Sequence, residues 1–397
     1  MPEKKSISIA IISDLHCQKY ENGNIRTKLH TKLYDKPINK HPVQSFKSII
    51  NSEGKKVDYF FVLGDVTNQA NEEGFIFGIK LIKELFDSLH AEKLLYAVGN
   101  HDLLFGKKEK REPFHMLQNT DDYPFHFKED NTTEFENKFW ANGFCIIEDN
   151  NTIILIINSG GELNEKKISN IDDAFLNKIE KELEGYKKSK KIKIAISHYH
   201  PIQHSDMDDF YTSLDMIERA DRLMDILEKS AFDLYIHGHK HIARLNYSNS
   251  IPIFCAGSFS SLENTEKFSI PNTAHFLQIF EKEGLEKSKG IIETWNYNLI
   301  DGWRKSKDPD SFFPTHTGFG ADTEINELAS QVYFHFKYEI DNYLEVKYNA
   351  IIEKIPDVQF LYPAQQKRFE EILFEMYSLA YSQINYSGYK SLKKQIR

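Results

Sequence analysis

The chain has few cysteines and no long apolar run, and both shortages restrict what it can be. Its three cysteines, Cys17, Cys145 and Cys255, are widely spaced and odd in number, so they do not indicate a disulfide framework. The sequence has no apolar run of the roughly 18 residues that a membrane span requires. The N-terminus also has no long apolar segment after its basic residues. We therefore expect a cytoplasmic protein with no membrane partner and no secretory signal.

Acidic residues outnumber basic ones, 59 to 50. The net charge of −9 gives the chain no general attraction for polyanions, although a local basic patch would still bind one. No Walker A loop is present, so the chain carries no ATPase of that type. Charged residues make up 27% and hydrophobic residues 40% of the 397 residues, as in a globular protein. The length suits one α/β domain of about 250–300 residues with an addition.

What the chain does contain is a series of five short polar signatures, each directly after an apolar run. In chain order the signatures are Asp14-Leu15-His16, Gly64-Asp65-Val66-Thr67-Asn68, Gly99-Asn100-His101-Asp102, Ser197-His198 and Gly238-His239-Lys240-His241. The runs before them are Ile7 to Ile12, Val57 to Leu63, Leu94 to Val98, Ile192 to Ile196 and Leu234 to Ile236. Such runs, separated by helical patterns, predict buried strands of an α/β sheet. Ligands gather beyond the carboxyl ends of these strands, so we expect the signatures to meet.

The residue types in the signatures indicate a particular chemistry. Carboxylates, an amide and imidazoles without a thiolate are typical of a hydrolytic site that holds two metal ions. A ligand that bridges two ions must offer two oxygens, and Asp65 is the candidate. Gly64, Gly99 and Gly238 stand where the strands must turn sharply and where a side chain would crowd the ions.

The order of the motifs resembles the calcineurin-like metallophosphoesterase superfamily, with D-x-H, G-D-x-x-N or D, G-N-H-D/E, H and G-H-x-H. The resemblance covers roughly residues 6 to 298. It implies an α/β fold, a four-layer αββα sandwich of two mixed β-sheets flanked by helices. It also implies a first metal held by Asp14, His16, Asp65 and His241. The second metal would be held by Asp65, Asn100, His198 and His239. We expect two divalent ions, Mn²⁺ first, with Fe, Zn or Ni as alternatives.

Two further residues of the third signature receive roles from the resemblance. His101 would donate a proton to the leaving-group oxygen, because the pKa of histidine lies near the working pH. Asp102 would accept a hydrogen bond from His101 and fix its tautomer. Outside the ligand sets, His200, His204 and His237 either contact the site or have structural roles. Cys17, next to His16, is expected to be a small buried filler.

The rest of the chain predicts a catalytic domain over residues 1–304 and a helical C-terminal extension over 305–397. Within the first, helices are expected at 42–54, 72–90 and 172–188, and a hairpin at 144–157. Three insertions, at 17–41, 103–131 and 199–217, should form loops that wall the active site. A basic group, Lys107, Lys108, Lys110 and Arg111, is either a solvated loop or a guide for a phosphate-bearing substrate.

The extension should contain helices near 324–354 and 363–386, rich in tyrosine and phenylalanine. Those aromatics either dock on the catalytic domain or form a surface for a protein partner or self-association.

In the catalytic part, the closest resemblance is to the bacterial cyclic-nucleotide phosphodiesterase-like branch. It implies hydrolysis of a nucleotide or nucleic-acid phosphodiester by metal-activated hydroxide. The arginines of the Ser/Thr protein phosphatase motifs are missing here. A DNA or RNA nuclease of the Mre11/SbcD type and a phosphoesterase-like subunit that acts through its tail are the alternatives.

Overall fold

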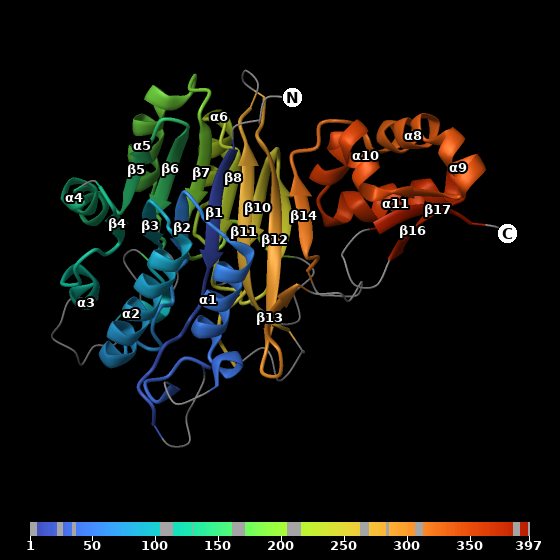
Figure 1. The fold of residues 1–397 in the computed structure, drawn as a ribbon. Helices are drawn as coiled ribbons and strands as arrows, with labels where there is room; N and C mark the ends of the chain where they lie inside the picture. The colour runs from blue at the N-terminus through green and yellow to red at the C-terminus, as the bar shows by residue number, and fades with distance from the viewer. Residues whose placement is uncertain are drawn as a thin grey trace. The chain divides into compact units, whose positions relative to one another are not determined.

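The computed structural model describes most of the chain and divides it into two compact units (Figure 1). The described residues are 6–21, 27–33, 37–103, 114–129, 131–160, 171–204, 216–262, 270–282, 286–305, 313–383 and 390–395. Unit 1 comprises Met1–Ser288 and Thr294–Lys305, and unit 2 comprises Lys289–Glu293 and Ser306–Arg397. The basic group at residues 107–111 lies outside the described residues, as does most of the insertion at 199–217.

The first large sheet is built on three parallel strands, β1 (Ser6–Ile12), β2 (Tyr59–Val62) and β3 (Lys93–Tyr96). β4 (Phe125–Phe127) is antiparallel to β3, and β11 (Asn272–Phe280) is antiparallel to β1. β12 (Lys289–Asn298) and β13 (Gly302–Lys305) extend the sheet beyond β11 in the order β13-β12-β11-β1-β2-β3-β4. The last three residues of each of these parallel strands are buried, as expected for a sheet covered on both faces.

The second large sheet has six strands in the order β5-β6-β7-β8-β10-β9. Their bounds are β5 (Phe144–Glu148), β6 (Thr152–Ile157), β7 (Ile192–Ile196), β8 (Leu234–His237), β10 (Ile251–Cys255) and β9 (Arg244–Ser248). β6, β7, β8 and β10 are parallel neighbours, whereas β5 and β9 are antiparallel edge strands. The five strands predicted before the signatures and the predicted hairpin are confirmed.

Helices cover the sheets, and several of them begin or end at recognisable capping residues. The helices of unit 1 are α1 (Pro42–Glu53), α2 (Glu72–Leu89), α3 (His115–Gln118), α4 (Thr133–Asn142), α5 (Asp173–Leu183) and α6 (Ala220–Lys229). At the start of α2 the side chain of Asn71 accepts a hydrogen bond from Gly74 N, and Glu72 and Glu73 offset the helix dipole. α1 ends at Gly54 with φ of 61°, a left-handed conformation that glycine adopts easily. Two mixed sheets with flanking helices confirm the predicted αββα sandwich.

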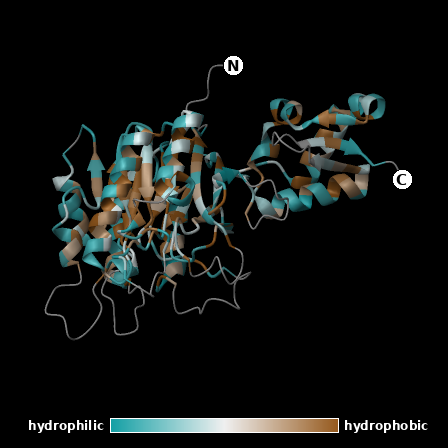
Figure 2. Cartoon of the chain, turned by 60° about the horizontal axis from the view of Figure 1, so that its bottom comes forward, coloured by the Kyte–Doolittle hydropathy of each residue, from teal (hydrophilic) through white to brown (hydrophobic). Residues whose placement is uncertain are grey.

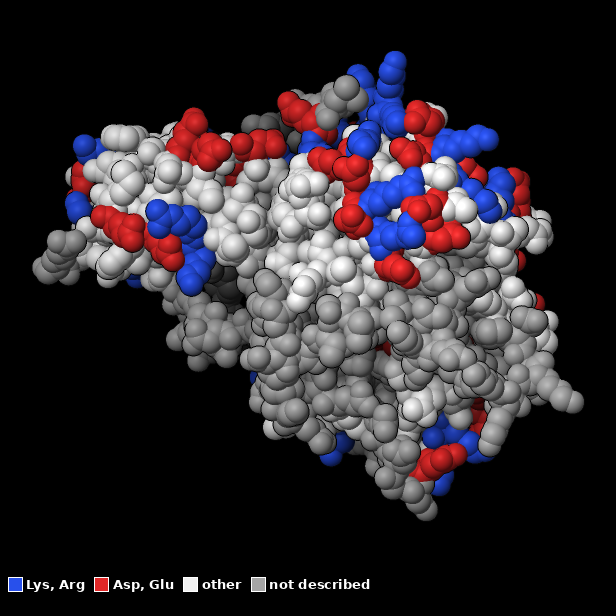
Figure 3. Space-filling view, turned by 180° about the vertical axis from the view of Figure 1, so that it is seen from behind, with Lys and Arg blue, Asp and Glu red and all other residues white. Residues whose placement is uncertain are grey.

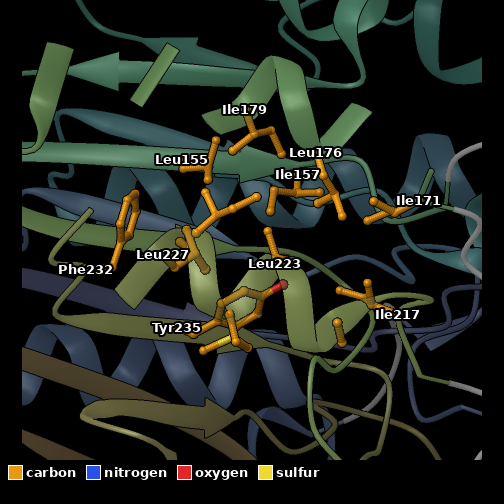
Figure 4. Packing of buried hydrophobic residues seen from close by; sticks show 14 of the residues in the cluster. Leu155, Ile157, Ile171, Leu176, Ile179, Ile217, Leu223, Leu227, Phe232 and Tyr235 are labelled. Atoms are coloured by element: carbon orange, nitrogen blue, oxygen red, sulfur yellow. The ribbon is translucent and has the colours of Figure 1, made fainter. Parts of the chain in front are cut away.

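The core beside the second sheet shows why α5 and α6 fold where they do. Apolar residues recur along α5 (Leu176, Ile179) and α6 (Leu223, Leu227) at helical spacing, and all four are fully buried. They pack with strand residues that include Tyr235, as Figure 4 shows. Each such leucine or isoleucine stabilises the fold by roughly 1.5–3 kcal/mol. In Figure 2 the apolar colours gather between the layers of unit 1, and the outer helix faces are hydrophilic.

Several elements of unit 1 were not predicted, among them α3, β4, α4 and α6. β4 and α3 lie within the insertion at 103–131, which the sequence indicated to be a loop. β4 has only three residues, too few for a periodic pattern, and it forms because Phe125 pairs with Leu95 at the edge of the sheet. α6 was also missed: its N-cap residue, Arg219, makes no side-chain hydrogen bond to the helix start, so the usual start signal is absent.

Unit 2 has a hydrophobic core of its own, which includes Leu328, Phe336, Ile351, Phe369 and Leu392. Its helices are α8 (Ile325–His335), α9 (Lys337–Tyr343), α10 (Tyr348–Lys354), η7 (Pro356–Phe360) and α11 (Pro363–Tyr377). Its strands β15 (Glu345–Lys347), β16 (Leu379–Gln383) and β17 (Lys390–Lys394) form an antiparallel sheet in the order β15-β17-β16. β14 (His316–Phe319) pairs with Gly290–Glu293. The expected extension is thus helical at the predicted centres, but it also contains strands that the sequence did not indicate.

Among the described residues, no helix is both long enough and apolar enough to cross a membrane.

Candidate metal centre

The carboxyl ends of strands in both sheets deliver the predicted ligands to one buried place. Asp14 and His16 follow β1, and Asp65 follows β2. Asn100 and His101 lie in the short 3-10 helix η3 (Asn100–Asp102) after β3. From the second sheet, His198 follows β7, and His239 and His241 follow β8. The structure therefore brings together residues that are more than 200 positions apart in the sequence, such as Asp14 and His239, whose amide N donates to Asp14 Oδ2 at 3.1 Å.

Most of these residues have a left-handed backbone, which is uncommon outside glycine. The φ angles are 53° at Asp14, 51° at His16, 52° at Asp65, 72° at His239 and 59° at His241. Such conformations cost free energy and persist only where surrounding contacts hold them, most often at functional sites. Backbone hydrogen bonds hold Asp14 and His16 in this conformation. Asp14 N donates to Gly64 O at 3.1 Å, and His16 N donates to Asp65 O at 2.8 Å.

The glycines of the signatures leave no room for a side chain, as the sequence predicted. A Cβ at Gly99 would lie 2.2 Å from Asp65 Oδ1, and a Cβ at Gly238 would lie 2.1 Å from Ser13 Oγ. At Gly64, where φ is 88°, a Cβ would lie 2.7 Å from His198 Nδ1. The backbone turns of the three motifs therefore pack directly against the candidate ligands.

The first predicted ligand set forms one compact group of four buried residues. Each of Asp14, His16, Asp65 and His241 offers a donor atom, and these atoms all lie within 4.8 Å of one another. Nε2 of His16 is 2.9 Å from Nε2 of His241 and 3.6 Å from Asp65 Oδ2. Asp14 Oδ1 lies 3.1 Å from Nε2 of His241 but is buried without a hydrogen bond. An unsatisfied buried carboxylate oxygen among imidazole nitrogens is the arrangement that a divalent cation would satisfy.

The second predicted set centres on His198. Its Nε2 is 3.4 Å from Asp65 Oδ2 and 3.0 Å from Asn100 Oδ1. The His239 ring lies beside it, with the two ring centroids 5.1 Å apart. Asp65 Oδ2 thus faces His16 of the first set and His198 of the second. Asp65 Oδ2 alone can therefore bridge two ions, whereas the bridge expected from the sequence used both oxygens.

Hydrogen bonds outside the two sets orient the ligands. Nδ1 of His198 lies 2.7 Å from the carbonyl oxygen of Leu63, which can only accept, so Nδ1 carries the proton and Nε2 is left for a metal. The other oxygen of Asp65, Oδ1, accepts from His101 N at 2.7 Å. Asp14 Oδ2 accepts from Ser13 Oγ as well as from His239 N. Each carboxylate therefore has one oxygen bound by the protein and the other facing the site.

Most of the pKa shifts favour the protonation states that metal ligands require, and His198 is the exception. Burial would raise the pKa of Asp65, but the charges of His198 and His101 hold it well below the usual value. Burial lowers the pKa of His16 to about 3 and lowers that of His239 well below the usual value. Burial also disfavours protonated His198, but the Asp65 charge outweighs this and raises its pKa to about 9. Anionic carboxylates beside neutral imidazoles are ready to bind a cation, and a cation would replace the proton on His198.

His101 and Asp102 have different environments, and the prediction for Asp102 is wrong. His101 lies beside the site, and its ring meets the His16 ring edge-on with centroids 4.7 Å apart. Its Nδ1 is 3.1 Å from Asn68 Oδ1, so Asn68 is the residue that orients it. Asp102 instead accepts hydrogen bonds from Thr67 N and Gly99 N, both at 3.0 Å. In the tight turn of η3 the third side chain points back to the free N–H groups at the start, and for that reason it reaches the backbone rather than His101.

Three more histidines lie close by in the interior. His200 is buried, and its ring stacks at a centroid distance of 5.9 Å on that of His239. His204 and His237 are also buried and form a separate group with Cys255. Cys17 is buried as expected, near Gly78 of α2, where a Cβ would lie 3.1 Å from its Sγ. The sequence singled out these histidines but not their grouping with Cys255.

The chain matches one protein family and is similar to several solved structures. A family model described as calcineurin-like phosphoesterase matches residues 7–243. A comparison with curated proteins finds no match. Among solved structures, a dimetal phosphatase from Danio rerio is 10% identical, with 74% of this chain and 99% of that chain covered and a TM-score of 0.45. Purple acid phosphatase PPD1 from yellow lupin is 14% identical, with 76% and 52% covered and a TM-score of 0.46. A putative 5'-nucleotidase from Staphylococcus aureus is 11% identical, with 77% and 57% covered and a TM-score of 0.41. These similarities do not indicate a substrate.

Proposed function

Because the chain belongs to the calcineurin-like phosphoesterase family and is a metal-dependent phosphoester hydrolase, we propose that it acts on phosphodiesters of nucleotides or nucleic-acid ends. The observation that supports this most is the position of His101. Its backbone N binds the candidate bridging carboxylate of Asp65, and its ring is oriented by Asn68. A histidine beside the reacting phosphate can donate a proton to a poor leaving group, and the alkoxide of a nucleotide sugar is such a group.

The proposed roles follow from the contacts of each side chain. Asp14, His16, Asp65 and His241 would hold one divalent ion, and Asp65, Asn100, His198 and His239 would hold the other. Two bound divalent ions neutralise phosphate oxygens and lower the pKa of water from 15.7 to about 7, which yields hydroxide at neutral pH. The Asn68 carbonyl accepts from Nδ1–H of His101. In the protonated ring this leaves Nε2–H to donate to the leaving-group oxygen.

A phosphodiester suits the site better than a phosphoprotein does. In the Ser/Thr protein phosphatase motifs, arginines stand at the positions occupied here by Gln69 and Leu104. A guanidinium binds the terminal phosphate of a monoester, which carries about −1.5 to −2 charges at pH 7. A diester phosphate carries a single charge and needs less compensation. The uncharged residues at these positions therefore favour a diester.

An intact duplex is a poorer candidate than a nucleotide or a strand end. The face of the molecule in Figure 3 carries blue and red side chains interspersed over its described part, not a continuous basic surface. For example, Arg219, the N-cap residue of α6, and Arg222 in α6 both pair with Asp173 of α5. Duplex binding depends mainly on clustered cations along the backbone of the nucleic acid. A small substrate needs only the charge of the metal centre.

The experiment that tests the proposal is a substrate panel with the Mn²⁺-loaded protein. Turnover should be measured for bis-p-nitrophenyl phosphate, p-nitrophenyl phosphate, cyclic mononucleotides, linear dinucleotides, single strands and closed circular duplex. We expect the diesters to be cleaved with higher kcat/KM than the monoester. Preferred hydrolysis of the monoester would contradict the phosphodiesterase proposal, and efficient cutting of the closed duplex would favour the nuclease alternative.

A second candidate function rests on the surface of unit 2. Large apolar side chains there are exposed: Phe334, Tyr338, Tyr343, Phe374 and Met376. Exposed apolar side chains that are contiguous are typical of a contact with another protein chain. We propose that this surface mediates self-association. Light scattering of the wild type and of a Phe334→Ser, Phe374→Ser variant tests this, with a monomeric wild type as the contradicting result.

A further inference from the structure

A second group of metal-binding side chains lies outside the phosphoesterase ligand sets. His237 is the last residue of β8 and Cys255 is the last residue of β10, and the two are direct partners in the register of these parallel strands. His204 follows β7 along the chain and reaches the same place. His237 and Cys255 are 0% exposed and His204 is 5% exposed. Three elements thus deliver three metal-binding side chains into the interior.

The spacing of these side chains fits a single tetrahedral ion. Their donor atoms all lie within 4.8 Å of one another. Nε2 of His204 is 3.3 Å from Nε2 of His237. In a tetrahedral zinc site with Zn–N of about 2.0–2.1 Å, two imidazole nitrogens are about 3.3–3.4 Å apart. A small inward shift of the thiol would complete the geometry, since Zn–S is about 2.3 Å.

Both rings have a hydrogen-bond partner at the outward nitrogen. Nδ1 of His237 lies 2.9 Å from the carbonyl oxygen of Gly238, so it carries the proton and directs a lone pair from Nε2 toward His204. Nδ1 of His204 accepts a hydrogen bond from Nδ2 of Asn246 at 2.9 Å, so Nε2 of His204 carries a proton that points to His237. A cation bound between the two rings would replace this proton.

His200 supplies a fourth candidate ligand and an independent observation. Its side chain is only 3% exposed, and its Nδ1 has no hydrogen-bond partner. Leaving a polar atom buried and unsatisfied costs about 1–3 kcal/mol, and a bound metal ion would remove this cost. The His200 ring centroid is 5.9 Å from that of His204 and 6.0 Å from that of His237. His200 lies outside the group of donor atoms that are within 4.8 Å of one another, so its ring would have to shift toward His204 and His237 to become a ligand.

We propose that His204, His237 and Cys255, with His200 as the fourth ligand, hold a zinc ion distinct from the two ions of the phosphoesterase centre. A thiolate together with imidazoles is a softer set than the carboxylate-rich first site, and it selects Zn²⁺ over Mn²⁺ or Mg²⁺. Binding releases the proton of the Cys255 thiol. A site with four protein ligands is closed, so its role is structural. It would tie β8 and β10 to the segment 198–204, which carries His198.

Metal analysis of three variants tests the proposal and separates it from the proposed function. The protein should be purified under reducing conditions, supplied with Zn²⁺ and Mn²⁺, and freed of loosely bound ions. We expect Cys255→Ala to lose one equivalent of zinc and Asp65→Ala to keep that equivalent while losing the phosphoesterase ions. Cys145→Ala is the matched control, because Cys145 is a buried free cysteine of β5 outside the group, and it should retain all ions.

Cobalt substitution gives a second readout that does not depend on activity. A Co²⁺–thiolate bond produces a ligand-to-metal charge-transfer band, which should be present in the wild type and Cys145→Ala and absent in Cys255→Ala. If Cys255→Ala does not fold, alkylation of the wild type decides: bound zinc should protect Cys255 at least tenfold, and a chelator should remove that protection. Equal zinc content in the wild type and Cys255→Ala, or no protection of Cys255, would overturn the proposal. The histidines would then form a hydrogen-bonded chain from Asn246 to Gly238.

Discussion

Asn68 Oδ1 lies 3.1 Å from Nδ1 of His101, and this contact gives the candidate acid its orienting partner. A carbonyl oxygen at that distance accepts from Nδ1–H and fixes the plane of the ring. The aspartate next to His101 in the sequence does not do so, because its carboxylate is bound by the amides of Thr67 and Gly99.

Asn68→Ala should therefore lower turnover of phosphodiesters by about 10–100-fold, the usual effect of removing a partner that orients a functional side chain. Metal content should stay unchanged, because Asn68 belongs to neither ligand set. Asn131→Ala, at an exposed asparagine before α4, is the control and should be neutral. Loss of metal together with activity in Asn68→Ala would show that Asn68 acts on the ions instead.

His101→Ala should reduce kcat by roughly 10²–10⁴-fold while the protein keeps its metals. The loss should be smaller for bis-p-nitrophenyl phosphate than for a dinucleotide, because nitrophenolate leaves without protonation. Initial rates for both substrates, measured with the wild type and the variant, give the comparison. An equal loss for both would indicate that His101 positions the phosphate and donates no proton.

Asp65→Ala should abolish metal retention and activity together, because Asp65 Oδ2 faces both ligand sets. Asp58→Ala is a matched control: it lies just before β2, whereas Asp65 lies just after it, and its carboxylate bonds Ser8 outside the site. Elemental analysis after gel filtration should show the ions in Asp58→Ala only. Two tightly bound ions remaining in Asp65→Ala would contradict the bridging role.

Gly99→Ala should also release metal, by displacing the Asp65 carboxylate that its Cβ would meet at 2.2 Å. The added Cβ would also lie 2.1 Å from the backbone N of Asp65. Neither this N nor the carboxylate can move far without breaking the turn after β2. Gly185→Ala, with no atom within 4 Å of the added Cβ, should leave metal content and activity unchanged. If Gly99→Ala binds metal as tightly as the wild type, the turn after β2 accommodates the added Cβ without displacing Asp65.

The ion pair of Lys289 and Asp357 should make unit 2 sensitive to acid. Burial would raise the pKa of Asp357, but hydrogen bonds from Lys289 Nζ at 2.7 Å and Thr323 Oγ1 at 2.6 Å lower it below the ordinary 3.8. A carboxylate with a lowered pKa in the folded state stabilises the fold above pH 3.8, and this is lost as the pH falls through the lower, folded value. Asp357→Asn should therefore cost roughly 1–3 kcal/mol at pH 7 and progressively less below about pH 4.

Hydrogen exchange of the α10 and η7 amides at pH 7 compares the local stability of the wild type and Asp357→Asn. Denaturant titrations at pH 7, 4 and 3 then measure how the difference in the free energy of unfolding depends on pH. Asp341→Asn is the control, because its pair with Lys394 in the same unit is about 40% exposed on both sides, with values of 43% and 41%. Exposed pairs contribute little, so this variant should be close to neutral at every pH. A penalty for Asp357→Asn that does not change with pH would contradict the electrostatic explanation.

That the polar signatures stand at strand ends was predictable from the sequence, whereas their division into two ligand sets came from the family resemblance. Asp14 and Asp65 follow parallel strands of the first sheet, and His198 follows a parallel strand of the second, so each sheet brings its own signatures to one edge. The glycine positions followed from the same pattern, since a tight turn beside a ligand excludes a Cβ. Helical periodicity located α1 and α2 to within a residue or two of their ends.

Tertiary structure alone decided the contacts that depend on which elements become neighbours. His237 meets Cys255 because β10 pairs with β8 and β9 is displaced to the edge, an order that no local pattern specifies. The turns after β2 and β3 pack against each other, and this packing fixes the direction of each side chain. For this reason Asn68 contacts His101 and Asp102 does not. The sequence by itself thus determined which polar residues stand at the strand ends. The packing of the two sheets determined which side chains contact these residues, since only the folded chain brings distant segments within hydrogen-bond distance.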